Sequence, residues 1–165
     1  QPLHALPISP RAEKVLEKAG ELALQYNHEA ITSAHLALAL LASDFGAHQS
    51  YLSRAGFNRP ACEADLILRL VRSGGAVEAP AASTLFYSES ALAILAAADR
   101  ERREAGQVFL GTQHLLLALL RDGSPLAGTL GKHGLDYFKA KPAMVPFAAV
   151  CERGAPAARH SVEAV

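Results

Sequence analysis

The sequence has no tryptophan, one methionine and two cysteines, and aromatic residues make up only 6% of its 165 residues. Cys62 and Cys151 provide no disulfide framework, which favours reduced thiols and a cytoplasmic location. No apolar run approaches the roughly 18 residues of a membrane span, since the densest covers only residues 115–120. Basic and acidic residues number 16 each, and this balance argues against a broad electrostatic surface for nucleic acid or acidic lipid.

Alanine and leucine supply most of the 50% hydrophobic content, a mix that favours close-packed helices. Ser9 and Pro10 form an N-cap signal, and apolar steps of three and four predict a helix over residues 10–26. Further helices are predicted over residues 34–43, 47–54 and 60–73. The helix over 34–43 is apolar all round, which predicts a place at the centre of a bundle.

The same pattern returns in the second half of the chain. His114 follows His35 by 79 residues, and the same offset relates Ser9 to Ser88 and Leu36 to Leu115. An internal repeat with this spacing predicts an all-α domain, a tandem repeat of two four-helix units packed with pseudo-two-fold symmetry. The two all-apolar helices are expected to pack against each other at the axis, because each needs partners on every side.

The expected organisation follows from this repeat. We predict an irregular lead-in over 1–8, a first repeat over 9–75, an inter-repeat loop over 76–87, a second repeat over 88–143 and a linker or tail over 144–165. The last helix of the second repeat should be degenerate, because Pro142 and Pro146 would interrupt it.

Residues that could carry chemistry favour structural interpretations. His35 and His114 could form a metal pair or supply a catalytic base. The sequence has no HxxxH, HExxH or CxxC pattern that would add metal ligands. We therefore interpret both histidines as structural residues that fix the starts of their helices, together with Ser33 and Thr112. Gly131-Lys132-His133 lacks the spacing of a phosphate loop. We therefore expect no catalytic residue, no metal site, no cofactor and no enzyme activity.

Three other features leave alternatives open. The charged run over 99–104 predicts a solvated helix face, with an adaptor contact as the alternative. Cys62 begins a helix, where a thiolate would be favoured, although an ordinary small helix residue is the simpler interpretation. Aromatic residues near helix ends could rim a groove for unfolded segments or anchor loops to the core, and these are Phe57, Phe86, Tyr87 and Phe109.

Two matched stretches carry a resemblance to a known family. Residues 27–36 read NHEAITSAHL and residues 106–115 read GQVFLGTQHL, and Ser9-Pro10-Arg11-Ala12 precedes the first of them. Both stretches resemble the motif of the Clp N-terminal repeat domain of ClpA-, ClpB- and ClpC-type AAA+ unfoldases, and the resemblance covers residues 8–140. The family usually has glutamate before the motif histidine, where this chain has Ala34 and Gln113. Phosphoarginine recognition, which uses those acids in ClpC-like members, is therefore not predicted.

The resemblance implies a non-catalytic docking domain that recognises unfolded or aggregated protein substrates, or an adaptor such as ClpS, for delivery to an ATPase ring. It implies no nucleic-acid or membrane partner, a monomeric isolated domain and a hexameric parent. The matched positions predict a binding surface, consisting of Ser9, Glu29, Ala34, Ser88, Gln107, Phe109 and Gln113. The alternative is a stand-alone accessory protein of the same fold that modulates a Clp protease or chaperone in trans. An unrelated enzyme is the third possibility, for which the sequence offers no constellation.

Overall fold

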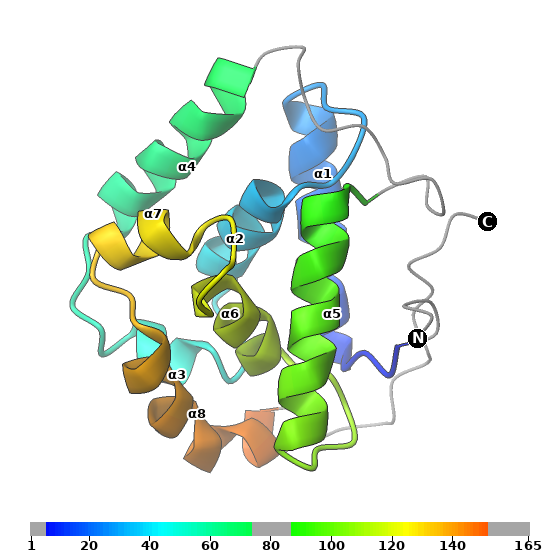
Figure 1. Ribbon diagram of the computed structural model, residues 1–165, viewed down its shortest axis with the longest axis vertical. Helices are drawn as coiled ribbons and strands as arrows, with labels where there is room; N and C mark the ends of the chain where they lie inside the picture. Colours follow the sequence, from blue (N-terminus) through cyan, green and yellow to red (C-terminus); the bar gives the residue numbers. More distant parts are fainter. Residues whose placement is uncertain (1–5, 74–86, 152–165) are drawn as a thin grey trace.

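The computed structural model describes residues 6–73 and 87–151, with side chains up to residue 144. Within these ranges the chain is helical, as predicted, and its only β-type pairs are two isolated bridges (Figure 1). The helices are α1 (Pro10–Gln25), α2 (Ser33–Ala42), α3 (Gln49–Leu52), α4 (Arg59–Ser73), α5 (Glu89–Glu104), α6 (Thr112–Leu120), α7 (Ala127–Lys132) and α8 (Tyr137–Cys151).

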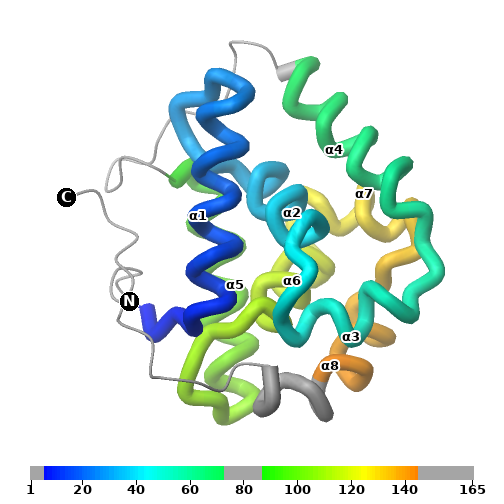
Figure 2. Tube along the Cα trace, turned by 180° about the vertical axis from the view of Figure 1, so that it is seen from behind, coloured from blue at the N-terminus to red at the C-terminus, as the bar shows by residue number. Residues whose placement is uncertain are grey.

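Helices α2 and α6 form the centre of the bundle (Figures 1 and 2). Every residue of α6 is buried, and so is every residue of α2 except Ala42. The two helices contact each other; α1 packs on both, and α5 also packs on both. A helix without a polar face can only be accommodated where neighbours cover all its sides, so the apolar sequence of α2 and α6 determines their central position.

The two halves are related by the offset of 79 residues seen between His35 and His114. Helix α1 begins at Pro10 and α5 at Glu89, and both are 16 residues long. The links between the halves are reciprocal: the Ser9 N–H donates to the Leu110 carbonyl at 2.9 Å, and the Ser88 N–H donates to the Ile31 carbonyl at 2.9 Å. A parallel bridge accompanies each link. Such an exchange of equivalent partners is what a pseudo-two-fold axis produces.

Helix α8 differs from the sequence prediction, because it continues through Pro142 and Pro146 to Cys151. The Asp136 carboxylate caps its first turn, accepting the Lys139 N–H at 2.9 Å. Ala140 and Met144 lie one turn apart, both are buried, and α8 packs on α3 and α6. We attribute the persistence of the helix to this packing, which offsets the hydrogen bonds that the prolines cannot donate. Residues 145–151, which the sequence analysis assigned to a linker or tail, are therefore helical, and residues 74–86 and 152–165 lie outside the described residues.

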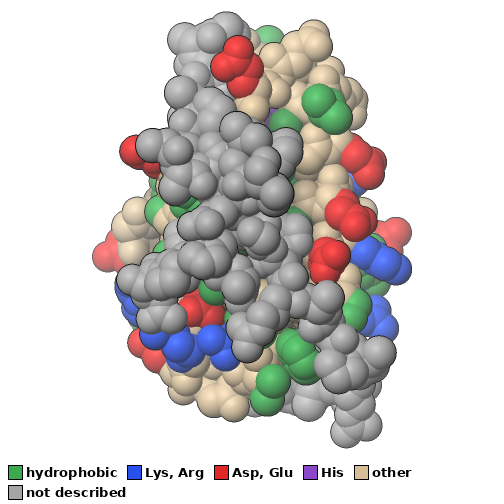
Figure 3. Space-filling model, turned by 90° about the vertical axis from the view of Figure 1, so that its right-hand side faces the viewer, with side chains coloured by type: hydrophobic (Ala, Val, Ile, Leu, Met, Phe, Trp, Pro, Cys, Tyr) green, Lys and Arg blue, Asp and Glu red, His purple; other side chains and the backbone are tan. Residues whose placement is uncertain are grey.

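Among the described residues, no helix combines the length and apolar character that a membrane span requires. The same residues contain no group of three side chains that could hold a metal ion. Acidic and basic side chains share the face shown in Figure 3, in keeping with the balanced charge of the sequence.

Replacing either capping serine with alanine should destabilise the domain by about 1 kcal/mol. Ser9 Oγ accepts the Ala12 N–H at 3.2 Å, and Ser88 Oγ accepts the Ala91 N–H at 3.2 Å, with both serines fully buried. Urea unfolding should show a loss for both Ser9→Ala and Ser88→Ala, and the loss should be at least as large for Ser88→Ala, because Ser88 Oγ also forms a hydrogen bond of 3.0 Å with Ser90 Oγ. The matched control is the exposed Ser53→Ala, which should change the free energy of unfolding by less than about 0.5 kcal/mol.

Candidate functional site

The two motif histidines close the first turns of the central helices. His35 Nδ1 accepts the Thr32 N–H at 2.9 Å, and His114 Nδ1 accepts the Gly111 N–H at 2.9 Å. Each ring therefore carries its proton on Nε2 and is neutral. Burial lowers the pKa of both imidazoles to about 4, with a smaller contribution from His28 at His35 and from Arg102 at His114. This geometry gives the histidines a capping role at the starts of α2 and α6.

Beyond this shared cap, the two repeats differ. In the first repeat, His35 Nε2 donates to His28 Nδ1 at 2.9 Å, so the buried N–H is satisfied. The offset places Gln107 at the position equivalent to His28, but Gln107 Oε1 accepts from Gln113 Nε2 at 3.2 Å. His114 is buried, with 2% of its surface exposed, and its Nε2 has no hydrogen-bond partner among the described residues.

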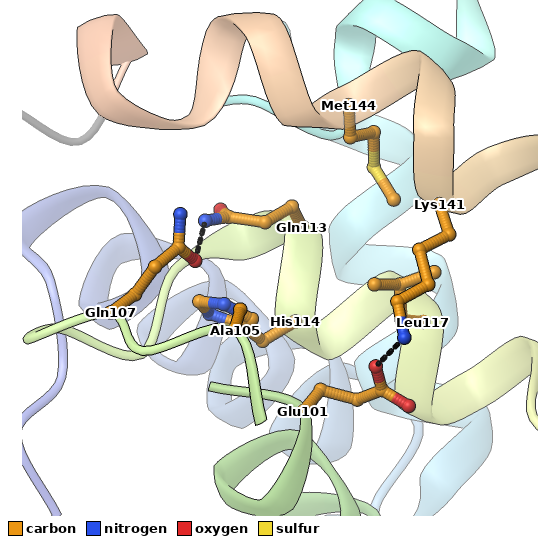
Figure 4. Close-up of a pocket in the computed structure, with 8 residues that line it drawn as sticks. All are labelled: Glu101, Ala105, Gln107, Gln113, His114, Leu117, Lys141 and Met144. Atoms are coloured by element: carbon orange, nitrogen blue, oxygen red, sulfur yellow. Dashed lines mark hydrogen bonds and ion pairs between the residues drawn. The ribbon is translucent and has the colours of Figure 1, made fainter. Parts of the chain in front are cut away.

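A small cavity of about 50 Å³ lies beside His114, between α6, α8 and the end of α5 (Figure 4). Its apolar lining comes from Ala105, Leu117 and Met144. Its polar lining comes from Glu101, Gln107, Gln113, His114 and Lys141. Glu101 Oε1, Gln113 Oε1 and His114 Nε2 are buried there without a hydrogen bond to a described residue. A buried polar atom without a partner is costly. The Lys141 ammonium offsets this cost at Glu101 Oε1, so Gln113 Oε1 and His114 Nε2 are the two atoms beside the cavity that no described residue satisfies.

The Glu101 carboxylate is held by neighbours on its other side. Its Oε2 accepts from Tyr137 Oη at 2.6 Å and from Arg121 Nη1 at 3.0 Å. Its Oε1 lies 3.5 Å from Lys141 Nζ, an ion-pair distance that is too long for a good hydrogen bond. Arg121 and Lys141 neutralise the charge of Glu101, whose Oε1 lies beside the cavity.

The prediction of a solvated face over 99–104 holds for Arg100, Arg103 and Glu104, which are exposed, and is wrong for the two buried acids. Asp99 and Glu101 are 3% and 2% exposed, and Asp99 pairs with Arg102 and Arg103 at 2.8 and 3.1 Å. The apolar stripe of α5 contains Ile94 and Ala98, and a helical step of three reaches Glu101. That periodicity is the sequence signal that could have identified Glu101 as a buried carboxylate.

A second, larger groove of about 480 Å³ lies in the first repeat, along α1 and the turn before α2. Glu17 and Glu21 line it from α1, and Glu29 lines it from the turn. Leu24, which is 77% exposed, and Ile31 supply apolar surface. An exposed leucine bordered by three carboxylates suits a segment that carries apolar and basic side chains.

The predicted binding residues do not form one continuous surface. Ser9 and Ser88 are fully buried helix caps, and Ala34 and Gln113 are each 5% exposed at the helix starts. Glu29 is exposed in the α1 groove, Gln107 is half-buried at the cavity, and Phe109 is half-buried beside the Ser9–Leu110 link. We therefore leave the buried serines and Ala34 out of the accessible surface. Sequence reasoning missed Glu17, Glu21 and Leu24 at the groove and Lys141 and Met144 at the cavity.

The remaining candidate residues that the structure describes have structural roles in the core or at helix starts. Ser33 N–H donates to Ser90 Oγ at 3.3 Å, and Thr112 Oγ1 accepts the His48 N–H at 3.3 Å, so both helix starts are linked to the other repeat. Burial raises the pKa of the Cys62 thiol to about 11, which favours the ordinary-residue interpretation. Tyr87 is buried and Phe57 packs partly on the core, whereas Phe86 lies outside the described residues.

Comparison with known proteins identifies relatives of this arrangement. The family model of the Clp repeat (R) N-terminal domain matches residues 7–133. The chain is 28% identical over 149 residues to the negative regulator of genetic competence ClpC/MecB of Bacillus subtilis, covering 90% of this chain and 18% of that protein. It is 28% identical over 132 residues to the chaperone protein ClpB of Oceanobacillus iheyensis, covering 79% and 16%. The chain thus spans less than a fifth of the length of these relatives.

A solved structure shows the same fold. The N-terminal domain of Hsp104 from Candida albicans superimposes with a TM-score of 0.66 at 21% identity, covering 84% of this chain and 89% of that one.

Proposed function

Because the chain belongs to the family of Clp repeat (R) N-terminal domains, we propose that it is a docking module, without catalysis of its own, that recognises protein substrates or an adaptor for a Clp-type AAA+ ATPase. The observation that carries this proposal is the groove along α1, where exposed Leu24 lies among Glu17, Glu21 and Glu29. An unfolded segment with leucine-like and basic side chains matches both its apolar and its acidic character.

Binding at one groove should be weak. One exposed leucine and three solvated carboxylates offer little area, so a dissociation constant of the order of 0.1–1 mM is expected. If the parent protein is a hexameric ring in the cytoplasm, several copies of the domain would engage one client together and raise the effective affinity. An adaptor such as ClpS could use the same groove.

Chemical-shift titration with a short peptide of alternating leucine and arginine tests the groove. Amide shifts should concentrate at Gly20, Leu24, Glu29 and Ile31 and weaken with added salt, because the attraction is partly electrostatic. Leu24→Ser should weaken binding about tenfold through lost apolar burial. Leu68→Ser, which replaces a 44% exposed leucine on α4, is the matched control and should bind as the wild type does.

A peptide of alternating leucine and glutamate should bind much more weakly, because its charge repels the groove. Equal binding of the two peptides, or equal loss from Leu24→Ser and Leu68→Ser, would remove the groove as the docking site.

A further inference from the structure

We propose that the acidic groove along α1 binds the α5 end of a second copy of this chain, where the α5 end means residues 99–111. The proposal names a partner for the groove, and it therefore rests on the groove being a docking surface. In Figures 1 and 2 the turn between α1 and α2, which lines the groove, lies at the upper end of the molecule, and the turn between α5 and α6 lies at the lower end. Two copies can thus meet end to end.

The offset of 79 residues shows that the two ends carry opposite charge. Glu21 of α1 corresponds to Arg100 of α5, and both side chains are exposed. The groove is lined by three carboxylates, and no lysine or arginine is among its described lining residues. At the α5 end, three arginines outnumber two acids over residues 99–104 once the neutralised Glu101 is set aside. This pattern favours contact between unlike ends and disfavours contact between like ends.

The two ends also differ in shape. Gly20 is among the lining residues of the groove and has no side chain to fill it. The offset places Asp99 at the equivalent position, where its carboxylate holds Arg102 and Arg103 at 2.8 and 3.1 Å. In the turn after them, the Val108 side chain is 71% exposed. The second repeat thus presents an exposed apolar side chain beside arginines where the first repeat is hollow and acidic.

The groups at the two ends can therefore satisfy each other. Val108 can pack on Leu24, since both are largely exposed in a single copy and their contact removes apolar surface from water. Arg100 can pair with the carboxylates of the groove. Ion pairs at a partly solvated contact are weak, so a dissociation constant of the order of 1 mM is expected. The contact joins unlike surfaces, and contacts of this kind close where copies are arranged in a ring.

Occupation of the groove by a second copy makes docking competitive. A segment with leucine-like and basic side chains offers the groove the same groups as the α5 end does, so it must displace the neighbouring copy in order to bind. The exposed Leu24 would then stay covered when no client is present, which lowers the risk of non-specific association.

Dilution of the isotope-labelled chain from about 2 mM to about 0.05 mM tests the contact. Amide shifts should change with concentration at Leu24 and Glu29 on one surface and at Val108 on the other, and the changes should shrink with added salt. Arg100→Glu should weaken the association at least about tenfold, because it places a carboxylate opposite the acidic groove. Arg72→Glu reverses the charge of an exposed arginine on α4 and is the matched control, which should associate as the wild type does.

Mixing two charge-reversal variants separates a lost contact from a lost fold. Glu21→Arg alters the groove and leaves the α5 end intact, whereas Arg100→Glu alters the α5 end and leaves the groove intact. Each variant alone should show little dependence on concentration. Unlabelled Glu21→Arg added to labelled Arg100→Glu should restore the shifts at Leu24 and Glu29, because an intact groove then meets an intact α5 end.

Three results would overturn the inference. These are wild-type shifts that do not depend on concentration, equal losses in Arg72→Glu and Arg100→Glu, and a mixture that associates no more than its components. The docking function is tested separately, because the leucine–arginine peptide is titrated into about 0.05 mM protein, where little of the wild type is associated. Arg100→Glu keeps the groove and should bind that peptide as the wild type does, so failure of self-association is distinguishable from failure of docking.

Discussion

Gly46→Ala should lower the free energy of unfolding by about 3 kcal/mol or more, through two effects that add. Gly46 has a φ of +108°, which side-chain-bearing residues rarely adopt. A Cβ there would lie 2.5 Å from Thr112 Oγ1 and 2.9 Å from its Cγ2. Thr112 begins the buried helix α6 and accepts the His48 N–H, so it has little freedom to move aside.

Urea unfolding at pH 7 measures this effect, and the midpoint should shift without a large change in slope. Gly128→Ala is the matched control, because Gly128 is the second residue of α7 and nothing lies within 4 Å of a Cβ there. Alanine is favoured over glycine in helices, and the first turn of α7 should show at most the gain of roughly 0.5–1 kcal/mol known for helix interiors, so this variant should not be less stable than the wild type. A Gly46→Ala protein within about 1 kcal/mol of the wild type would contradict the close packing between the two repeats.

Acidification from pH 6.5 to pH 4 should destabilise the domain by several kcal/mol, because buried histidines must remain neutral. Burial lowers the pKa of His35, His48 and His114 to about 4 each. Between pH 4 and 6.5 the unfolded chain therefore binds more protons than the folded chain, and stability rises with pH across this window. The contribution is fully present above about pH 6.5 and is lost as the pH falls through 4. His114 alone would supply about 3 kcal/mol.

Urea unfolding at several pH values between 4 and 7 measures the slope. His48 is suited to a test by substitution, because its Nε2–H donates to the Leu40 carbonyl at 2.9 Å, a bond that the glutamine amide can replace. His48→Gln should therefore flatten the pH dependence by about a third while keeping most of the stability at pH 7. An unchanged slope in this variant would show that His48 does not titrate with folding.

The sequence was sufficient to predict most of the fold because its signals are local and occur twice. The serine caps, the apolar character of α2 and α6 and the 79-residue offset each depend on neighbouring residues or on simple comparison of the halves. The continuation of α8 through Pro142 could not be predicted this way, since it depends on tertiary burial of Ala140 and Met144.

The candidate sites were harder to predict. The family motifs predicted Glu29, Gln107 and Gln113 as binding residues, but a motif gives position along the chain and not exposure. Ser9 and Ser88 matched equally well and are buried caps. The cavity needs Glu101 from α5 and Lys141 from α8 beside His114, a combination that depends on how distant helices pack.

The reciprocal Ser9–Leu110 and Ser88–Ile31 links bear on how the duplicated halves could diverge. At these links the start of α1 or α5 in one repeat hydrogen-bonds to the segment before the central helix of the other repeat. A change of backbone position in one repeat must therefore fit the other repeat. His28 and Gln107 instead contact residues of their own copy, and there the two halves have become different. The two halves thus keep equivalent contacts where they hold each other and differ at His28 and Gln107, which contact only their own half.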